Sequence, residues 1–410
     1  MLFVRFFMRR LKILWHALCA AFKLLPLMLL LLQPTKTILP GIYIHIPFCR
    51  QACSYCDFYF STSLANKGAV VSAIIEETRL RHAYLSDRHL NSIYFGGGTP
   101  SLLSQSELGA IMEQLGRFFS WNSSAEVTLE ANPDDITPQA LQSWKAAGIN
   151  RLSIGLQSFN DDELKWMNRA HNAAESVASV KMAQDAGFDN ITIDLIYGSK
   201  FQTPASWEKT LEQAIALNTQ HISSYNLTIE DKTVLGVKNA AGKEPSVNDE
   251  LSSRQFMVML HMLRQAGFIQ YEISNFGREG YFAVHNSNYW LQKEYLGLGP
   301  SAHSYNGVSR QWNVKNNSQY IKAINSNSAY FEKEELQLND RYNEYILTRL
   351  RTTWGCDIKE MESLFGKVMS DRFETMILEK KEFIFESQGI YTLNDAGKLQ
   401  ADGIAADLFV

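Results

Sequence analysis

Short runs of β-branched and aromatic residues alternate with longer stretches of helical periodicity along the first half of the chain. The runs predict strands at Ile42–Ile46, Ser92–Phe95, Glu126–Glu130, Arg151–Gly155, Asn190–Ile196 and His221–Tyr225. The stretches between them predict helices over Gly68–Leu85, Ser104–Phe119, Thr137–Ala147, Asp161–Ala186 and Pro204–Leu217. This alternation is typical of right-handed βαβ units and a parallel sheet. Because these units are too few to close a (βα)8 barrel, we expect an α/β fold with a partial (βα)6 barrel.

The pattern changes after about residue 230. We expect a loop over Lys232–Asp249, a helix over Glu250–Ala266, and a loop-rich stretch over 271–315. Residues 340–410 predict helices followed by a short hairpin. The predicted parts are an N-terminal extension over 1–40, the partial barrel over 41–230, an α+β extension of the barrel over 231–335, and a small helical or winged-helix-like domain over 336–410.

The first 40 residues differ in composition from the rest. Arg5, Arg9, Arg10 and Lys12 lie among apolar residues, Leu24–Leu32 is nearly all leucine, and no acidic residue precedes Asp57. Three interpretations stay open: a start codon assigned too early, a helix that lies on or inserts shallowly into a membrane surface, and a secretory signal. Lys23 and Pro26 interrupt the apolar core that the last of these needs.

Charge and cysteine content narrow the chemistry. The 410 residues carry a net charge of −4, which gives no electrostatic case for binding nucleic acid. Three of the five cysteines, Cys49, Cys53 and Cys56, fall within one short segment, whereas Cys19 and Cys356 stand alone. A secreted disulfide framework usually has an even and dispersed set. The triplet therefore indicates metal ligation in a reducing compartment, which favours the cytoplasm.

The spacing of the triplet is C-x3-C-x2-C, directly after the first predicted strand. Iron–sulfur clusters are normally held by four cysteines, so three would leave one iron of a cubane without a protein ligand. An open coordination position marks a reactive metal centre. The alternative is a zinc site with His45 or a distant group as fourth ligand. Zinc sites more often use paired C-x2-C elements, and the sequence has no second pair.

A glycine run, Phe95-Gly96-Gly97-Gly98-Thr99-Pro100, follows the second predicted strand. Such a run lets the backbone approach a ligand closely. C-x3-C-x2-C after a first strand resembles the radical S-adenosylmethionine (SAM) superfamily. The wider run Tyr43-x-His45-Ile46-Pro47-Phe48-Cys49 is similar to the oxygen-independent coproporphyrinogen III oxidase branch of that superfamily. The resemblance covers roughly residues 41–400.

This resemblance implies a [4Fe-4S] cluster on Cys49, Cys53 and Cys56 and a bound SAM. The positions that match SAM-contacting residues are Tyr43, Tyr55, Gly97, Gly98, Thr99, Glu130, Gln157, Arg169 and Asp194. Glu130, Gln157 and Asp194 fall at or near the ends of predicted strands, and a charge amid an apolar strand is costly unless it is paired or ligand-bound. The alternative is that Glu130 and Arg169 form a structural ion pair and that Asp194 caps a turn.

Two further features point to one branch of the family. The oxidases carry another cysteine at the position that Phe58 occupies here, whereas Cys56-Asp57-Phe58 is similar to the heme chaperone (HemW-like) branch. The run from His285 to Trp290 matches the H-N-x-x-Y-W heme-binding motif of that branch, which implies His285 as a heme ligand. The alternative is a packed loop whose histidine hydrogen-bonds the backbone.

The resemblance thus implies a heme chaperone that binds a [4Fe-4S] cluster, SAM and heme. Such a protein would pass heme to respiratory proteins such as cytochromes and would lack coproporphyrinogen oxidase activity. It would be cytoplasmic, with peripheral association at the inner face of the membrane and homodimer formation as open alternatives. The competing hypotheses are a coproporphyrinogen III oxidase that acts through a 5′-deoxyadenosyl radical, and a zinc-bound structural protein.

Overall fold

The computed structural model describes residues 39–410, which form one compact unit. At its centre each parallel strand pairs with the next one along the chain. These strands are β1 (Gly41–Ile46), β2 (His89–Gly97), β3 (Ser120–Ala131), β4 (Arg151–Gln157), β5 (Asn190–Tyr197) and β6 (His221–Asn226). The strand predictions are therefore confirmed. The N-terminal extension falls, up to residue 38, outside the described residues.

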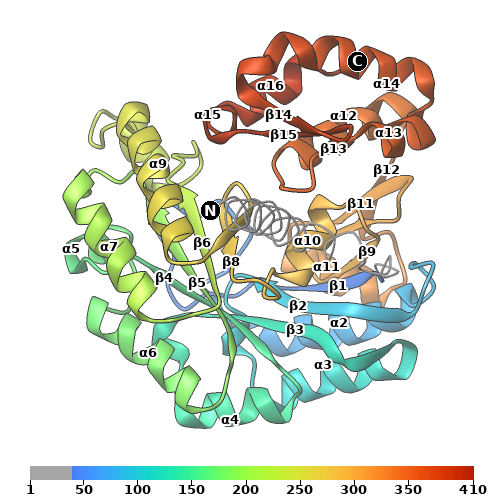
Figure 1. Ribbon diagram of the computed structural model, residues 1–410. Helices are drawn as coiled ribbons and strands as arrows, with labels where there is room; N and C mark the ends of the chain where they lie inside the picture. The colour runs from blue at the N-terminus through green and yellow to red at the C-terminus, as the bar shows by residue number, and fades with distance from the viewer. Residues whose placement is uncertain (1–38) are drawn as a thin grey trace, which may run out of the picture. The chain divides into compact units, whose positions relative to one another are not determined.

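Helices connect these strands, and most of them line the outer face of the sheet (Figure 1). They are α2 (Lys67–Arg81), α3 (Gln105–Phe118), α4 (Pro138–Ala146), α5 (Asp161–Trp166), α6 (Ala173–Asp185) and α7 (Pro204–Ala216). The prediction of one helix over Asp161–Ala186 is wrong, because residues 167–172 separate α5 from α6. Asn172 and Glu175 form a reciprocal capping box that begins α6.

The sheet continues past both ends of this parallel centre. Next to β1 lie the parallel strand β9 (Tyr295–Leu298) and then, antiparallel, β10 (His303–Tyr305), β11 (Ser309–Asn313) and β12 (Phe331–Glu335). Next to β6 lie β8 (Asn275–Gly277) and β7 (Ile269–Glu272), both antiparallel to their neighbours. Over residues 39–410 the sheet stays open between its edges β12 and β7, which confirms a partial barrel.

The second half of the chain is more ordered than its sequence indicates. The helices here are α8 (Val234–Ala240), α9 (Asp249–Gln265), α10 (Val284–Trp290) and α11 (Asn317–Asn325). In the first half of the chain, short 3-10 turns follow β2 (Pro100–Leu102) and β3 (Pro133–Asp135). The prediction of a loop over Lys232–Asp249 is wrong where α8 forms, with Thr233 as its N-cap. The loop-rich stretch predicted over 271–315 supplies β8 to β11 and α10.

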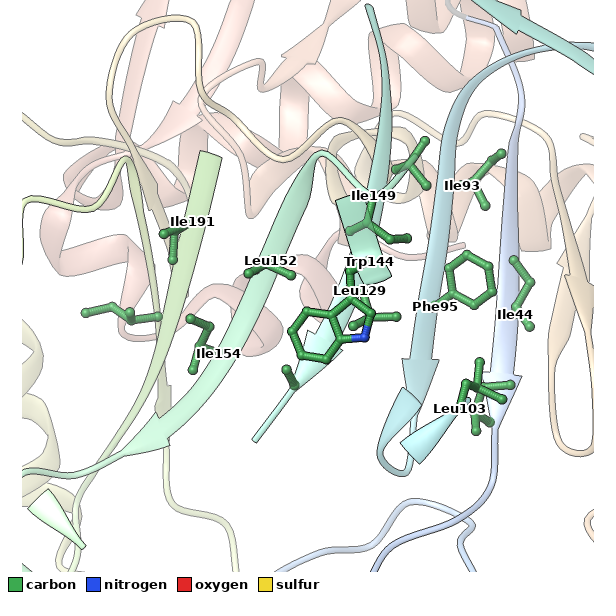
Figure 2. Packing of buried hydrophobic residues seen from close by; sticks show 14 of the residues in the cluster. Ile44, Ile93, Phe95, Leu103, Leu129, Trp144, Ile149, Leu152, Ile154 and Ile191 are labelled. Carbon is green, nitrogen blue, oxygen red and sulfur yellow. The ribbon is translucent and has the colours of Figure 1, made fainter. Parts of the chain in front are cut away.

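The apolar side chains of the central strands pack against the helices in a single core (Figure 2). Ile93, Leu129, Leu152 and Ile191, from four neighbouring strands, are all fully buried there. Trp144 of α4 packs into the same cluster. This face of the sheet is apolar because helices cover it, as expected for parallel strands. The opposite face carries different chemistry.

The C-terminal residues build a second, separate hydrophobic cluster. Their elements are α12 (Leu338–Leu350), β13 (Cys356–Asp357), α13 (Ile358–Phe365), α14 (Lys367–Ile377), a 3-10 segment (Leu378–Phe383), β14 (Ile384–Ser387), β15 (Ile390–Leu393), α15 (Asp395–Lys398) and α16 (Ala401–Asp407). The strands form an antiparallel sheet in the order β13-β15-β14. This is the winged-helix-like arrangement expected, while the domain boundaries stay predictions. Over residues 39–410, no helix is long and apolar enough to cross a membrane.

A buried carboxylate joins α2 to the added strands. Glu77 accepts hydrogen bonds from Gly299 N at 2.8 Å, from Asn313 Nδ2 at 2.8 Å and from Tyr320 Oη at 2.5 Å. Its side chain is fully buried, and burial raises its pKa. One side chain thereby satisfies three buried donors from the β9–α11 region.

We predict that Glu77→Ala lowers the free energy of unfolding by ~3 kcal/mol, because it leaves buried donors without an acceptor. Glu77→Gln keeps the shape and one acceptor oxygen, so its loss is expected to be about one third as large. Urea unfolding of the two variants measures the difference. Equal losses would contradict this account, because the shape and the acceptor oxygen that glutamine retains would then contribute nothing.

Candidate functional site

A cavity of about 650 Å³ runs along the inner face of the sheet, opposite the helices. This volume suits a ligand of cofactor size. Every site residue expected from the sequence lines it: Tyr43, Cys49, Cys53, Tyr55, Cys56, Gly97, Gly98, Thr99, Glu130, Gln157, Arg169, Asp194 and His285. Residues far apart in sequence thus line one cavity, and those that follow or end β1 to β5 meet there as the carboxyl ends of parallel strands predict.

The loop that carries Cys49, Cys53 and Cys56, the cysteine loop, follows β1. Hydrogen bonds hold it to the segment between α5 and α6. Ser54 N donates to Met167 O and Ser54 Oγ to Trp166 O, both at 3.0 Å. Gln51 donates to the backbone and side-chain oxygens of Asn168, which donates in turn to Ala52 O at 2.6 Å. Asn168 has φ of 58°, a left-handed conformation that asparagine tolerates. The break between α5 and α6 therefore positions the thiols.

The three thiols do not converge on a point. Among the side chains of residues 39–410, no three from Cys, His, Asp and Glu are placed to hold a single metal ion. A cubane cluster carries its irons at separate corners, so thiols that each hold one iron need not converge. Burial raises the pKa of Cys49 and raises that of Cys56 to about 11. Metal binding would therefore release protons from these thiols at neutral pH.

His45, the fourth ligand of the zinc alternative, is engaged elsewhere. Its Nε2 lies 3.0 Å from Tyr59 O and its Nδ1 lies 3.1 Å from Tyr43 Oη. Nε2 must therefore donate, and Nδ1 accepts the tyrosine proton. Burial lowers the His45 pKa to about 4, so the ring is neutral. His45 orients Tyr43 towards the cavity and has no lone pair free for zinc.

The glycine run passes close beneath the cysteine loop. A Cβ on Gly98 would lie 2.7 Å from the backbone N and O of Phe48, and a Cβ on Gly97 would lie 2.5 Å from the His45 ring. Gly97 also has φ of 108°, which side chains rarely adopt. Only glycine lets the end of β2 lie this near the cysteine loop. Gly97 and Thr99 then border the cavity.

Arg169 connects the cysteine loop to two strand ends. Its Nη1 donates to Cys53 Sγ at 3.2 Å, and its Nη2 donates to Asn132 Oδ1 at 2.6 Å and to Gly155 O at 2.8 Å. Within residues 39–410, Nε is buried without a hydrogen-bond partner. Because the guanidinium lines the cavity, this donor fits a carboxylate such as that of SAM.

Two carboxyl groups give the cavity its negative character. Glu130 accepts from Tyr94 Oη at 2.7 Å and from Gly97 N at 3.2 Å, and Asp194 accepts from Ser153 Oγ at 3.3 Å. The alternative in which Glu130 pairs with Arg169 is therefore not what forms. Burial raises the pKa of Glu130 to about 7 and that of Asp194 to about 6. A cationic ligand such as a sulfonium or an amine would offset this desolvation cost.

Gln157 and Tyr55 complete the expected set. Gln157 has φ of 67° and follows an irregularity in the pairing of β4 with β5, and such bulges re-aim a side chain. Tyr55 lies in the cysteine loop, and burial raises its pKa well above the ordinary value. Its hydroxyl therefore stays protonated and can donate to a ligand.

His285, the expected heme ligand, lies on α10 in the cavity wall with only 2% of its surface exposed. Its Nδ1 is 2.9 Å from Ser92 Oγ and its Nε2 is 2.8 Å from Tyr289 Oη. Burial lowers its pKa to about 3. Iron ligation needs an uncommitted ring nitrogen, and this arrangement offers none. The residues present therefore do not fit a heme iron at His285.

Sequence reasoning missed the deeper part of the cavity. Arg151 and His221 line it from the first residues of β4 and β6. Tyr271 Oη lies 3.0 Å from Asn286 Nδ2 and 2.9 Å from His221 Nε2. Tyr271 Oη accepts from the amide, and the direction of its bond to the ring depends on the tautomer of His221. The missed signal is alternation: Arg151 precedes Ser153, and His221 precedes Ser223, by the two-residue period of a strand.

The raised pKa of Glu130 predicts a pH-dependent stability. The pKa in the folded protein, about 7, exceeds the ordinary value of 4.5, so the folded state binds more protons. Stability is fully present below about pH 4.5 and falls as pH rises through about 7. Glu130→Gln removes this loss. Relative to the wild type without ligands, the variant should gain ~2 kcal/mol in unfolding free energy between about pH 5 and about pH 8.

Urea unfolding at the two pH values measures this gain. Glu113→Gln is the matched control, because Glu113 is exposed and paired only with Arg117. If Glu130→Gln gains no more unfolding free energy than Glu113→Gln over this pH range, the raised pKa of Glu130 is contradicted.

The model of the radical SAM superfamily matches residues 43–214. The heme chaperone HemW of Bacillus subtilis is 34% identical over 363 residues, 87% of this chain and 96% of the relative. HemW of Haemophilus influenzae is 31% identical over 381 residues, 88% and 95% of the two chains.

Among solved structures, coproporphyrinogen III oxidase (HemN) from Escherichia coli, described as a radical SAM enzyme, aligns with a TM-score of 0.78. The alignment has 24% identity and covers 91% of this chain and 90% of that one, which establishes the shared fold. The extent of the sequence matches decides the family. The chain belongs to the HemW family of the radical SAM superfamily.

Proposed function

We propose that this protein is a heme chaperone that carries a [4Fe-4S] cluster and SAM and passes heme to respiratory proteins such as cytochromes. One observation carries the proposal: the heme chaperone HemW of Bacillus subtilis is matched over 96% of its own length. The chain thus has the counterpart of nearly every part of that protein, including the C-terminal region.

The cysteine loop supports the cluster part of the proposal. Cys49, Cys53 and Cys56 border one cavity with the glycine run and Arg169. A cubane held by three thiolates keeps one iron free for a chelating ligand, and in its reduced state it can supply an electron to SAM. The protein would hold the cluster through the loop that Asn168 and Ser54 fix.

The charges of the cavity wall support SAM as that ligand. Glu130 and Asp194 would face the cationic amine and sulfonium or accept from the ribose hydroxyls, and Arg169 would hold the carboxylate. Gly97 and Thr99 would let the backbone approach the ligand. Tyr43, which His45 orients, would close the site on the β1 side.

Phe58 separates the proposal from the oxidase alternative. Its side chain is 73% exposed and lines the cavity mouth, at the position where the resemblance places a further cysteine in the oxidases. The alternative function, coproporphyrinogen III oxidase, is favoured by the shared fold with HemN. As part of the proposal we assign the protein to the cytoplasm, because open thiols need a reducing compartment.

Parallel incubations of the anaerobically reconstituted protein test the proposal. With heme alone, we predict a Soret band that saturates at one heme per chain, and transfer of that heme to a heme-free b-type cytochrome. With coproporphyrinogen III, SAM and a reductant, we predict no protoporphyrinogen IX above the level of a Cys53→Ala control. Turnover in the second incubation, or no heme binding in the first, would contradict the chaperone assignment.

A further inference from the structure

The histidine of the H-N-x-x-Y-W signature is bonded inside the protein through both ring nitrogens. Nδ1 of His285 meets Ser92 Oγ at 2.9 Å, and Nε2 meets Tyr289 Oη at 2.8 Å. Each partner is a hydroxyl, which donates or accepts as needed. Whichever nitrogen carries the proton, both are therefore engaged.

The other signature residues are occupied in the same way. Asn286 Nδ2 donates to Tyr271 Oη at 3.0 Å, and Trp290 Nε1 donates to Asn286 Oδ1 at 3.1 Å. The guanidinium of Arg351 lies 5.4 Å from the centre of the Trp290 ring, a cation–π contact. The Asn286–Tyr271 bond ties α10 to β7, and the Trp290–Arg351 contact ties it to the C-terminal region, whereas the Trp290–Asn286 bond lies within α10.

The start of α10 is anchored to the central sheet as well. Glu126 of β3 accepts from Val284 N at 2.9 Å and from His285 N at 3.0 Å. Its carboxylate is buried and 3.5 Å from Arg151 Nη1. A carboxylate at a helix start is favourable, and a buried one that loses its donors is costly. Drawing His285 out of the wall would break these contacts together.

The ring of His285 also supports two tyrosines of the cavity. It stacks on Tyr94 with ring centres 5.2 Å apart and on Tyr43 with centres 6.3 Å apart. Behind it, a Cβ on Gly41 would lie 2.9 Å from Nδ1, so β1 packs directly against the ring. Tyr94 in turn donates to Glu130 at 2.7 Å. The ring therefore sets the positions of side chains proposed to face SAM.

We propose that His285 is a positioning residue of the SAM-facing wall and not an axial ligand of heme iron. A histidine that ligates heme iron needs open space beside its ring nitrogen for the porphyrin plane. His285 has no such space, because its ring is packed between two stacked tyrosines and a strand. Iron could take a ring nitrogen only after a hydroxyl partner and the stack were lost. The inference rests on the proposed function, because it assigns heme to other residues of the same protein.

Two titrations on a common set of variants test the proposal. The first follows the Soret band and the electron paramagnetic resonance (EPR) spectrum of ferric heme, which report the axial ligand. The second measures the SAM dissociation constant of the reconstituted protein by equilibrium dialysis. The variants are His285→Ala, which removes the ring, His285→Phe, which restores the stacking alone, and Ser92→Ala and Tyr289→Phe, which each remove one ring partner.

We expect the heme spectra and heme affinity of all four variants to match the wild type within about twofold. His285→Ala should weaken SAM binding about tenfold, the worth of an aromatic contact, and His285→Phe should recover most of that loss. Recovery by phenylalanine, which cannot bind iron, is a result that neither misfolding nor loss of an iron ligand would produce.

The opposite pattern would overturn the proposal. If His285 binds iron, His285→Ala and His285→Phe lose or shift the axial-ligand spectrum. Ser92→Ala and Tyr289→Phe would then tighten heme binding by freeing a nitrogen. If His285→Ala does not fold, the heme affinities of Ser92→Ala and Tyr289→Phe still show whether His285 binds iron. A wild type that binds no heme refutes the proposed function instead, and unchanged SAM affinity in His285→Ala then overturns the positioning role.

Discussion

Each central strand carries apolar side chains on one face and polar side chains on the other, and the rest of the structure depends on that separation. The face towards the helices is apolar, with Ile93, Leu129 and Leu152 in its core. The inner face places polar residues at alternate positions along the cavity: Glu130 on β3, Arg151 and Ser153 on β4, Thr192 and Asp194 on β5, His221 and Ser223 on β6. The two-residue period of a strand keeps these sets apart.

Desolvation is the cost of this arrangement. Glu130 and Asp194 are half-buried in the cavity wall, and burial raises the pKa of both. The folded chain without ligands therefore stores unfavourable energy at the strand ends, which a bound cation would relieve. Arg169 adds the complementary charge beside Cys53. The site is thus built for a ligand with both positive and negative groups, next to the thiols.

The sequence predicted much of the fold and of the site. Strand and helix periodicity predicted the order β1 to β6, and the cysteine and glycine runs were correctly expected to follow β1 and β2. Where capping chemistry competed with periodicity, periodicity misled: Asn172 and Glu175 begin a new helix inside an apparently continuous one. The strand β9 was not predicted, because Tyr295–Leu298 is short and contains Gly297.

The sequence could not show the tertiary contacts of α10, for a different reason. Ser92 and Glu126, which bond His285, and Tyr271, which bonds Asn286, lie outside the motif, and only the folded sheet brings them to α10. A motif can fix which residues recur together. It cannot show whether a histidine in it faces a ligand or its own neighbours.

The proposed function requires that three thiols hold a cubane whose free iron faces the cavity proposed for SAM. The EPR spectrum of the reduced, anaerobically reconstituted protein, recorded before and after saturation with SAM, is the measurement that tests this requirement. We predict a [4Fe-4S]⁺ signal whose g values change when SAM is added. A protein that yields no such signal, or one whose signal SAM leaves unaltered, would contradict this requirement.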